Sequence, residues 1–251
     1  MTAPGTLTPD RFGFTGPASA PSIDPPPHYY RGTDLATFDF ETSSAAAAAL
    51  VPEGLSLAHE TARGRVVFAD FAFSTLGSYR EAMLQLACTW EGRRVMYCPY
   101  LVVTGDVGLI AGREVWGAPK LLGSVALEKA GPVVSCRVER AGVRIAHGTM
   151  RPRDPVEPGD GGPPLVFLKV IPSPEAGAPP EVCELVEVDL RSSVHRGSDG
   201  RPELFAGPAD LRFEMSPVDP WAALPVPRTV RATYGRFDSV LDHGRVLHRY
   251  A

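Results

Sequence analysis

Apolar and polar residues alternate along several short segments of the chain, which is the pattern of β-strands that have one buried face. Segments 133–139 and 143–150 alternate in this way around Ala141 and Gly142, and they predict a β-hairpin. Other segments are rich in Val, Phe, Tyr and Thr and predict further strands; they are 65–73, 83–90, 94–104, 165–171 and 183–191. The pattern therefore favours a mostly antiparallel β protein.

Signals for helices are few. Ser43 and Ser44 are typical N-cap residues and predict a short helix over 45–50, which ends before Pro52. Residues 238–249 predict a C-terminal helix. Many antiparallel strands with few helices indicate an α+β fold, and a sheet that closes on itself removes its unpaired edges and can enclose a ligand. We therefore expect a closed or cone-like β-barrel with a few flanking helices.

The organisation along the chain indicates one domain preceded by an arm. Residues 1–27 are rich in Pro, Ser and Thr and predict an extended or disordered N-terminal arm, which could wrap a neighbouring subunit. Residues 28–251 predict a single domain, because 251 residues with 44% hydrophobic content can bury one full core. Residues 151–164 contain many Pro, Gly and Asp and predict a surface loop.

Charge and composition exclude several classes of function. The 25 Lys and Arg residues and the 29 Asp and Glu residues give a formal net charge of −4, and both signs are spread along the chain. We therefore expect neither a nucleic-acid nor a membrane partner. No segment reaches the ~18 apolar residues of a membrane span, and the N-terminus lacks the basic start and apolar core of a signal peptide. A cytoplasmic protein is expected.

Common cofactor and hydrolase motifs are missing from the sequence. The four cysteines lie far apart in apolar segments, as free core cysteines do. The six histidines form no metal-binding pattern such as H-E-x-x-H, and no G-x-S-x-G motif occurs. Segments 105–108 and 159–162 are glycine-rich but lack the residues that complete a phosphate loop, so they predict turns. Other residues must carry the chemistry, and we expect no metal.

The most informative segment is 112–123, which reads GREVWGAPKLLG. It places Lys120 after a rigid Ala-Pro step and before two leucines, so its amine is expected near apolar surface. Desolvation disfavours the ammonium form, and an amine nucleophile must be uncharged to attack. On local sequence alone, however, a lysine after a proline is usually a solvated surface group. The segment needs support from the rest of the chain.

That support comes from a resemblance to the acetoacetate decarboxylase-like superfamily, whose lysine signature segment 112–123 resembles. Further matches follow in the same order, at 50–53 (LVPE), 167–172 (FLKVIP), 183–185 (CEL) and 224–226 (LPV). The resemblance thus covers about residues 35–250. It implies that Lys120 forms a Schiff base with a small keto acid, that no cofactor is needed because the imine is itself the electron sink, and that the protein is a homo-oligomer.

Two departures from the family pattern bear on the reaction. In acetoacetate decarboxylase a second lysine follows the nucleophile, and that enzyme is the usual example of an amine activated by a neighbouring cation; here the position is Leu121. The first of its two pocket glutamates falls near Ala69, whereas the second matches Glu81. The resemblance therefore points to the aldolase-dehydratase relatives, in which a pyruvate enamine attacks an aldehyde and water is then lost.

Five further residues are candidates for the site. Glu81 and Tyr250 are candidate proton-transfer groups, although either can serve packing or pairing alone. Arg113 can bind a substrate carboxylate through its planar fork of donors, or can brace the segment that carries Lys120. Trp116 and Tyr79 can form walls of the pocket, or can be ordinary core residues.

Two rival functions stay open. The first is decarboxylation of acetoacetate or a larger β-keto acid through the same imine, which Glu81 favours and Leu121 opposes. The second is a non-catalytic protein that binds a small carboxylate, which would not require Lys120. The sequence identifies neither the keto acid nor the aldehyde, and it determines neither the pathway nor the number of subunits.

Overall fold

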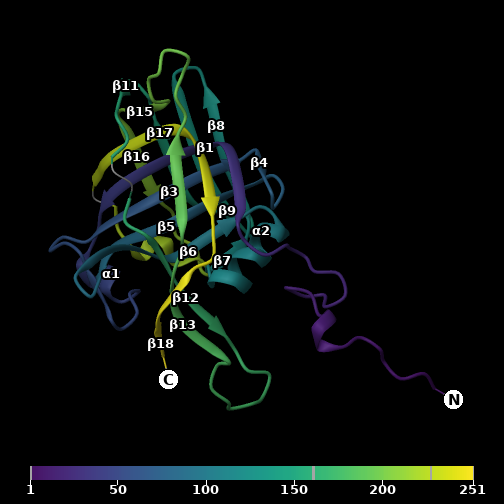
Figure 1. Ribbon diagram of the computed structural model, residues 1–251. Coiled ribbons are helices and arrows are strands. Elements are labelled where there is room, and N and C mark those ends of the chain that lie inside the picture. Colours follow the sequence, from purple (N-terminus) through teal and green to yellow (C-terminus); the bar gives the residue numbers. More distant parts are fainter. Residues whose placement is uncertain (1, 160–161, 227, 251) are drawn as a thin grey trace.

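Two β-sheets make up most of the molecule (Figure 1). The computed structural model describes residues 2–159, 162–226 and 228–250. In this part of the chain the larger sheet has 14 strands, and its main path runs β11-β15-β17-β1-β3-β5-β6-β12-β13-β18. The strands on this path are β1 (His28–Glu41), β3 (Arg63–Phe71), β5 (Tyr79–Trp90), β6 (Arg93–Val103), β11 (Asp154–Pro155), β12 (Leu165–Ile171), β13 (Val182–Glu187), β15 (Leu204–Ala206), β17 (Arg228–Leu241) and β18 (Arg245–Arg249). Short strands pair with this path from the side, namely β2 (Leu55–Leu57) with β5, β4 (Phe73–Ser74) with β1, β7 (Lys120–Leu122) with β6 and β14 (Leu190–Val194) with β17.

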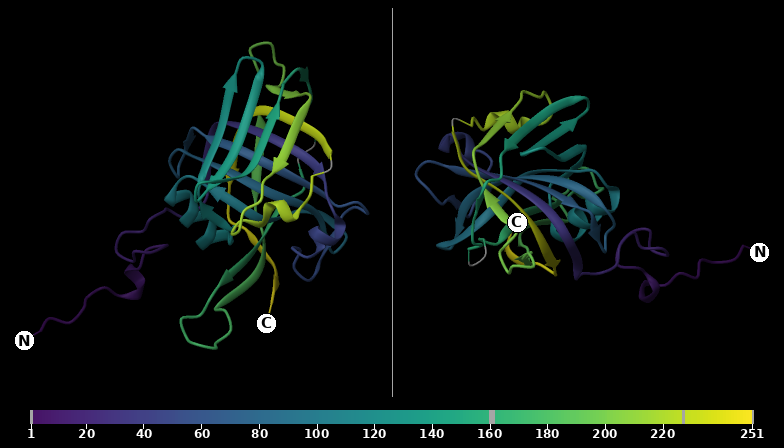
Figure 2. Two further views of the ribbon diagram at one scale, coloured as in Figure 1. Left: turned by 180° about the vertical axis from the view of Figure 1, so that it is seen from behind. Right: turned by 90° about the horizontal axis from the view of Figure 1, so that it is seen from above.

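A smaller sheet of four strands crosses the large one, as Figure 2 shows. Its strands are β8 (Ser124–Ala130), β9 (Val133–Arg140), β10 (Val143–Met150) and β16 (Ala209–Phe213), in the order β16-β10-β9-β8. The main core lies between the two sheets. Phe40 of β1 packs edge to face against Phe213 of β16, with ring centroids 5.5 Å apart. Such burial of apolar surface is the main favourable term in folding, so contact between the sheets stabilises both.

The prediction of a closed barrel is wrong. The described path of the large sheet begins at β11 and ends at β18, and these two strands are not paired with each other. Closure is unnecessary because the small sheet covers one face of the large sheet and buries its apolar side chains. The prediction of a mostly antiparallel fold with few helices is confirmed: only β12 and β7 pair in parallel, each with β6, among the described strands.

Several predicted strands are confirmed at or near their bounds. Strands β10 and β12 begin and end where the sequence predicts them. Strands β9 and β10 form the expected hairpin, and its turn residues Ala141 and Gly142 have φ of 50° and 77°, as in the tight turns that match the twist of a hairpin. The single strand expected at 183–191 is instead two, β13 and β14, because one pairs with β12 and the other with β17.

The predicted C-terminal helix at 238–249 is wrong. The end of β17 and the whole of β18 occupy this region, and β18 pairs with β13. Pairing with distant strands outweighs local helix propensity here, since β17 is hydrogen-bonded to β1 over nearly its full length. Strand β1 itself is absent from the sequence-based prediction, although its buried residues Ala36, Phe38 and Phe40 do alternate.

The helices are short. They are α1 (Ser44–Ala48), α2 (Asp106–Ala111), the π-helical turn η2 (Gly112–Trp116), and the 3-10 turns η1 (Pro9–Arg11) and η3 (Pro220–Ala223). The predicted helix near 45–50 is confirmed as α1, with Ser43 as its N-cap: the Ser43 hydroxyl accepts from the backbone N–H of Ala46. The turn predicted at 105–108 is wrong, because α2 starts there at Asp106. No described helix has both the length and the apolar character to span a membrane.

Residues 2–27 leave the body of the molecule and extend to one side (Figures 1 and 2). Most of their side chains are exposed. Near the end of this segment Ile23 is buried in a second apolar cluster, together with Tyr30 and Tyr79. This second cluster lies at the strand ends that carry the candidate site.

Candidate functional site

A tight helical segment turns the chain so that Lys120 enters the protein. Helix α2 continues directly into the π-helical turn η2, which ends at Gly117 with φ of 74°, a left-handed conformation that favours glycine. The backbone N–H of Ala118 donates to the carbonyl of Gly112 at 2.9 Å and closes this turn. Strand β7 then pairs in parallel with β6 and places Lys120 opposite Leu101.

The amine of Lys120 forms a buried ion pair with Glu81. Its Nζ lies 2.9 Å from Oε2 of Glu81, and the two side chains are only 9% and 8% exposed. Glu81 comes from β5, where it pairs with Val103 of β6. Removing two charges from water is unfavourable unless each finds a partner, so each side chain provides the charge that the other requires. The lysine is therefore held in dry surroundings beside a carboxylate that can accept its proton.

Two tyrosines extend the site. Nζ of Lys120 lies 5.6 Å from the ring centroid of Tyr79, a cation–π distance. The hydroxyl of Tyr79 is 3.1 Å from that of Tyr30, and the ring of Phe71 lies 4.8 Å from each of the two phenol rings. Burial raises the pKa of Tyr30 and of Tyr79 well above 10, and the nearby charge of Glu81 raises both pKa values further.

The tyrosine pair holds a spare proton. Both phenols keep their O–H at neutral pH because both pKa values are raised. One hydrogen bond between the hydroxyls of Tyr30 and Tyr79 uses only one of the two protons. No described residue other than this pair accepts the second proton. A substrate oxygen that approaches Lys120 past the Tyr79 ring could therefore accept it.

Gly112 leaves the space that the lysine side chain occupies. A Cβ atom built on Gly112 would lie 2.5 Å from Cε and 2.6 Å from Cδ of Lys120. These distances are shorter than van der Waals contact, so only glycine allows the observed path of the lysine. The backbone of Gly112 is helical, with φ of −62° and ψ of −45°, so its requirement is for space and not for an unusual conformation.

We expect Gly112→Ala to lower the rate of imine formation with little loss of stability. The added methyl group displaces the flexible end of Lys120 from Glu81, and a misplacement of about 1 Å can lower a rate roughly 100-fold. The melting temperature should fall clearly less than in Lys120→Met, because the backbone there accepts alanine and both charges of the pair remain. The measurement is the rate of pyruvate trapping with borohydride. Gly159→Ala is the control, since its methyl group would meet no atom within 4 Å; equal rates in both variants would contradict the assignment.

The other predicted site residues have different surroundings. Arg113 donates from Nη1 to the backbone carbonyl of Lys120 at 3.2 Å, which is the bracing contact. Trp116 is buried, and its Nε1 donates to the carbonyl of Asp242 at 3.1 Å. The hydroxyl of Tyr250 donates to the carbonyl of Glu53 at 2.6 Å. The structure thus brings Lys120, Glu81 and Tyr79 together directly, and Arg113 reaches only the backbone of this group.

Three residues near the lysine are missing from the sequence-based prediction. Tyr30 lies on β1, and its closeness to Tyr79 depends on sheet pairing that no local pattern shows. Gly112 belongs to the informative segment, but only the folded lysine reveals its role. Lys169 donates to the carbonyl of Val115 at 3.1 Å and so braces the π-helical turn; it lies in segment 167–172, which the resemblance to the family did single out.

Comparison with known proteins determines the family. The family model described as acetoacetate decarboxylase matches residues 14–251. This chain belongs to the acetoacetate decarboxylase family. The resemblance inferred from segment 112–123 and the matches that follow it is therefore confirmed.

Curated relatives of this family member are similar over nearly their whole length. An acetoacetate decarboxylase of Acidiphilium cryptum is 28% identical over 244 residues, which cover 94% of this chain and 95% of the relative. The decarboxylase DEC1 of Cochliobolus heterostrophus is 28% identical over 255 residues, with 94% of each chain covered. The protein is thus a member of an enzyme family that includes decarboxylases.

Solved structures share the fold of this family member. The crystal structure of acetoacetate decarboxylase from Legionella pneumophila superposes with a TM-score of 0.82 at 19% identity and covers 99% of both chains. The enduracididine biosynthesis enzyme MppR, in complex with the condensation product of pyruvate and imidazole 4-carboxaldehyde, superposes with a TM-score of 0.80 at 22% identity. That match covers 99% of this chain and 100% of MppR. One fold therefore occurs in both kinds of protein.

Proposed function

We propose that this family member is a lyase in which Lys120 forms an imine with pyruvate or a similar 2-keto acid, and that the resulting enamine condenses with an aldehyde before water is lost. The observation that carries the proposal is the buried pair of Lys120 and Glu81, with Ala69 beside Glu81. The pair supplies a nucleophile and a base, and Ala69 removes a second negative charge from the pocket.

The chemistry begins with proton transfer within the pair. Glu81 accepts a proton from the Lys120 ammonium, and the free amine attacks the keto carbon of the substrate. Loss of water from the carbinolamine gives the iminium, which draws electrons from the adjacent methyl group. A base removes a methyl proton to give the enamine, and we assign this step to Glu81 after it has passed its first proton to the leaving water.

Condensation then completes the cycle. The enamine carbon attacks the aldehyde carbon, and the aldehyde oxygen takes up a proton, for which the spare proton of the Tyr30 and Tyr79 pair is suitably located. The phenolate left in the tyrosine pair then removes a second proton from the former methyl carbon, and protonated Glu81 gives its proton to the hydroxyl, which leaves as water as the carbon–carbon double bond forms. Hydrolysis of the iminium releases the unsaturated 2-keto acid and Lys120. We assign proton transfer to Glu81 and the tyrosine pair in preference to Tyr250, whose hydroxyl already donates to the carbonyl of Glu53.

Ala69 is the residue that favours condensation. It pairs directly with Glu81 across β3 and β5, so the two side chains lie on the same face of the sheet. A glutamate at this position would place a second carboxylate beside Glu81 and repel the carboxylate of a substrate. With alanine there, Lys120 balances the single charge of Glu81, and no second carboxylate repels the carboxylate of pyruvate. Leu121 does not contribute to this choice, because it is 41% exposed and lies on the opposite side of β7 from Lys120.

Decarboxylation of a β-keto acid is the second candidate. The relatives that are 28% identical are decarboxylases, and Glu81 matches the glutamate that the family pattern retains. The same imine would accept the electron pair of the breaking carbon–carbon bond as carbon dioxide leaves. Both candidates therefore share the nucleophile and differ in what the pocket does with the carboxylate.

Parallel assays separate the two reactions. Wild-type protein with pyruvate and an aromatic aldehyde should produce a conjugated product, seen as a growing ultraviolet absorbance, and should release little carbon dioxide from acetoacetate. Rapid gas release without any condensation product would replace the first candidate with the second. The comparison uses equal enzyme and substrate concentrations, so that the ratio of the two kcat/KM values is measured directly.

We expect Tyr30→Phe to reduce kcat about tenfold or more while leaving KM for pyruvate within about threefold. The change removes the hydroxyl that orients Tyr79, and a lost proton donor affects the chemical step more than substrate binding. Tyr29→Phe is the matched control, because Tyr29 is the exposed neighbour on the opposite face of β1. Equal kcat values for both variants would exclude the tyrosine pair from proton transfer.

A further inference from the structure

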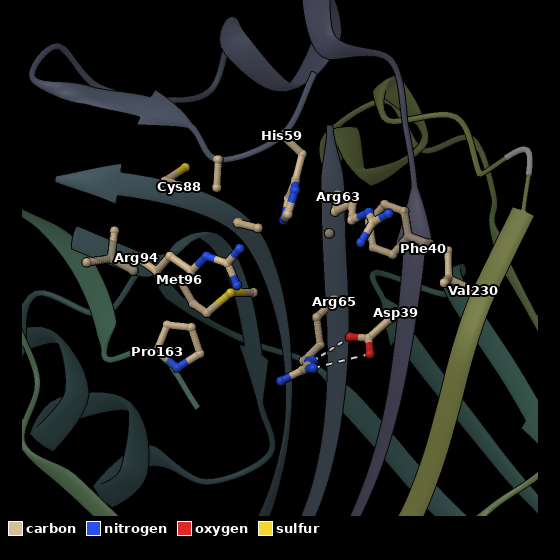
Figure 3. Close-up of a pocket in the computed structure, with 14 residues that line it drawn as sticks. Asp39, Phe40, His59, Arg63, Arg65, Cys88, Arg94, Met96, Pro163 and Val230 are labelled. Carbon is tan, nitrogen blue, oxygen red and sulfur yellow. Dashed lines mark hydrogen bonds and ion pairs between the residues drawn. The ribbon is translucent and has the colours of Figure 1, made fainter. Parts of the chain in front are cut away.

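A hollow in the large sheet lies away from Lys120. It has a volume of about 190 Å³ and its lining contains Ala87 of β5 and Met96 of β6, but neither Lys120 nor Glu81 (Figure 3). Met96 of β6 lines the hollow, and Val103 of the same strand pairs with Glu81. These two residues are separated by roughly 23 Å along β6. Along β5, Glu81 and Ala87 lie on the face opposite to the main-core residues Ala82, Leu84 and Leu86. The hollow and the lysine site therefore lie at opposite ends of one face of the large sheet.

The charged lining of the hollow is cationic. Arg63 and Arg65 come from β3 and Arg94 from β6, and His59 comes from the segment between β2 and β3. Asp39 of β1 is the acidic residue of the lining. The positive groups of the lining therefore outnumber the negative one.

Only one of these arginines has its charge balanced. Arg65 donates to Asp39 through two bonds, Nε to Oδ1 at 2.6 Å and Nη2 to Oδ2 at 3.2 Å. The side chains of Arg63 and Arg94, which are both exposed, take part in no ion pair or hydrogen bond in the described part of the chain. Figure 3 shows Arg94 and His59 extending toward the same space, with Arg65 held below them by Asp39.

The hollow itself exists because the residue at its floor is small. Ala87 lies on β5 between β3 and β6 and pairs with Met96. A larger side chain at position 87 would extend into the space between the arginines. The remaining lining includes Pro163 and Val230, which present apolar surface, since both are exposed. The site thus combines unbalanced guanidinium groups with an apolar wall.

We propose that this hollow binds a small organic carboxylate, distinct from the keto acid at Lys120. The planar fork of Arg94 matches the geometry of a carboxylate, and its charge has no ion-pair partner within the described protein. The apolar wall contacts the hydrocarbon part of the ligand, which distinguishes this ligand class from inorganic phosphate. His59 adds a ring nitrogen to the polar side of the site.

Titration with benzoate tests the proposal. At low ionic strength, calorimetry should show saturable binding of benzoate to the wild type and much weaker binding of benzamide, its uncharged analogue. Lys120→Ala should retain benzoate binding, because the two sites are separate. Loss of the binding in Lys120→Ala would place benzoate at the lysine and overturn the proposal, and so would a wild type that binds inorganic phosphate more tightly than benzoate.

Adjacent arginines on β6 provide a matched pair of variants. Arg94→Gln should weaken benzoate binding at least about tenfold, the scale of a lost hydrogen bond to a charged group. Arg93→Gln removes the same charge from a residue that pairs with Glu187 and does not line the hollow, so its affinity should stay within about twofold of wild type. Equal weakening in both variants would show a general effect of charge and would contradict a specific site.

Filling the hollow without changing its charge is an independent test. Ala87→Leu should abolish benzoate binding while thermal unfolding shows a folded protein. Unchanged binding would exclude the hollow. Sedimentation of the wild type and Arg94→Gln should give the same mass; a change in mass would mean that a second copy of the chain covers the arginines, and the ligand proposal would then fail.

Discussion

Lys120→Ala should abolish covalent capture of pyruvate and lower turnover by roughly 10⁴-fold or more, the scale expected when a covalent nucleophile is removed. The wild type treated with pyruvate and borohydride should gain a three-carbon adduct on Lys120, and the variant should gain none. The reason is that only the Lys120 amine combines burial with a carboxylate 2.9 Å away that can accept its proton. Mass spectrometry of the intact protein and of its peptides measures both results.

The other lysines of the chain, Lys129 and Lys169, make the result easy to interpret. Lys129→Ala is the control, because Lys129 is half exposed and pairs with Asp34 outside the site, so this variant should be labelled as the wild type is. An adduct on Lys129 or Lys169 would contradict the assignment of Lys120. Pyruvate binding to the wild type without any adduct would instead support a non-catalytic binding protein.

The second large effect is on stability. Glu81→Gln and Lys120→Met should each destabilise the protein by about 3–5 kcal/mol, because each leaves a buried charge without its partner. The double variant removes both charges, so its free energy of unfolding should fall by clearly less than the sum of the two single losses. Urea unfolding of the four proteins gives this coupling energy as a double-mutant cycle.

An exposed ion pair provides the control cycle. Lys129 and Asp34 are 2.8 Å apart, but the lysine side chain is 49% exposed, so water and salt screen the attraction. The cycle of Lys129→Met and Asp34→Asn should give a coupling energy below about 1 kcal/mol. The prediction would be contradicted if the two single losses of stability in the Lys120 and Glu81 cycle added up to the loss in the double variant, or if both cycles gave the same coupling energy. Either result would mean that burial does not strengthen the pairing of Lys120 with Glu81.

Local features of the structure follow from the sequence. Alternation over 143–150 predicts β10 at its observed bounds, because a strand with one buried face requires apolar residues at every second position. The hairpin turn at Ala141 and Gly142 and the cap of α1 at Ser43 are equally local, since each depends on a few neighbouring residues. The lysine motif around Lys120 is also contiguous, which is why the family could be inferred before the fold was known.

Long-range pairing accounts for what the sequence did not predict. The region 238–249 contains residues that suit a helix, but β17 and β18 form there because distant strands supply their hydrogen-bond partners. The closed barrel was predicted wrongly for the same reason: a second sheet covers the large one, and this arrangement depends on the path of the whole chain. Local propensity is a weak energy compared with burial of a strand between two neighbours.

For the candidate site, too, the sequence indicates individual residues, whereas the fold decides which of them are in contact. The sequence by itself indicated that Lys120 is the candidate nucleophile and Glu81 a candidate proton-transfer group. Only the tertiary structure decided that the two are in contact, that Tyr30 joins Tyr79 beside them, and that Tyr250 is bonded elsewhere. Residue types and their spacing along the chain indicate which chemistry is available, but contacts between segments far apart in the sequence depend on strand register, which is set by the packing of the whole protein.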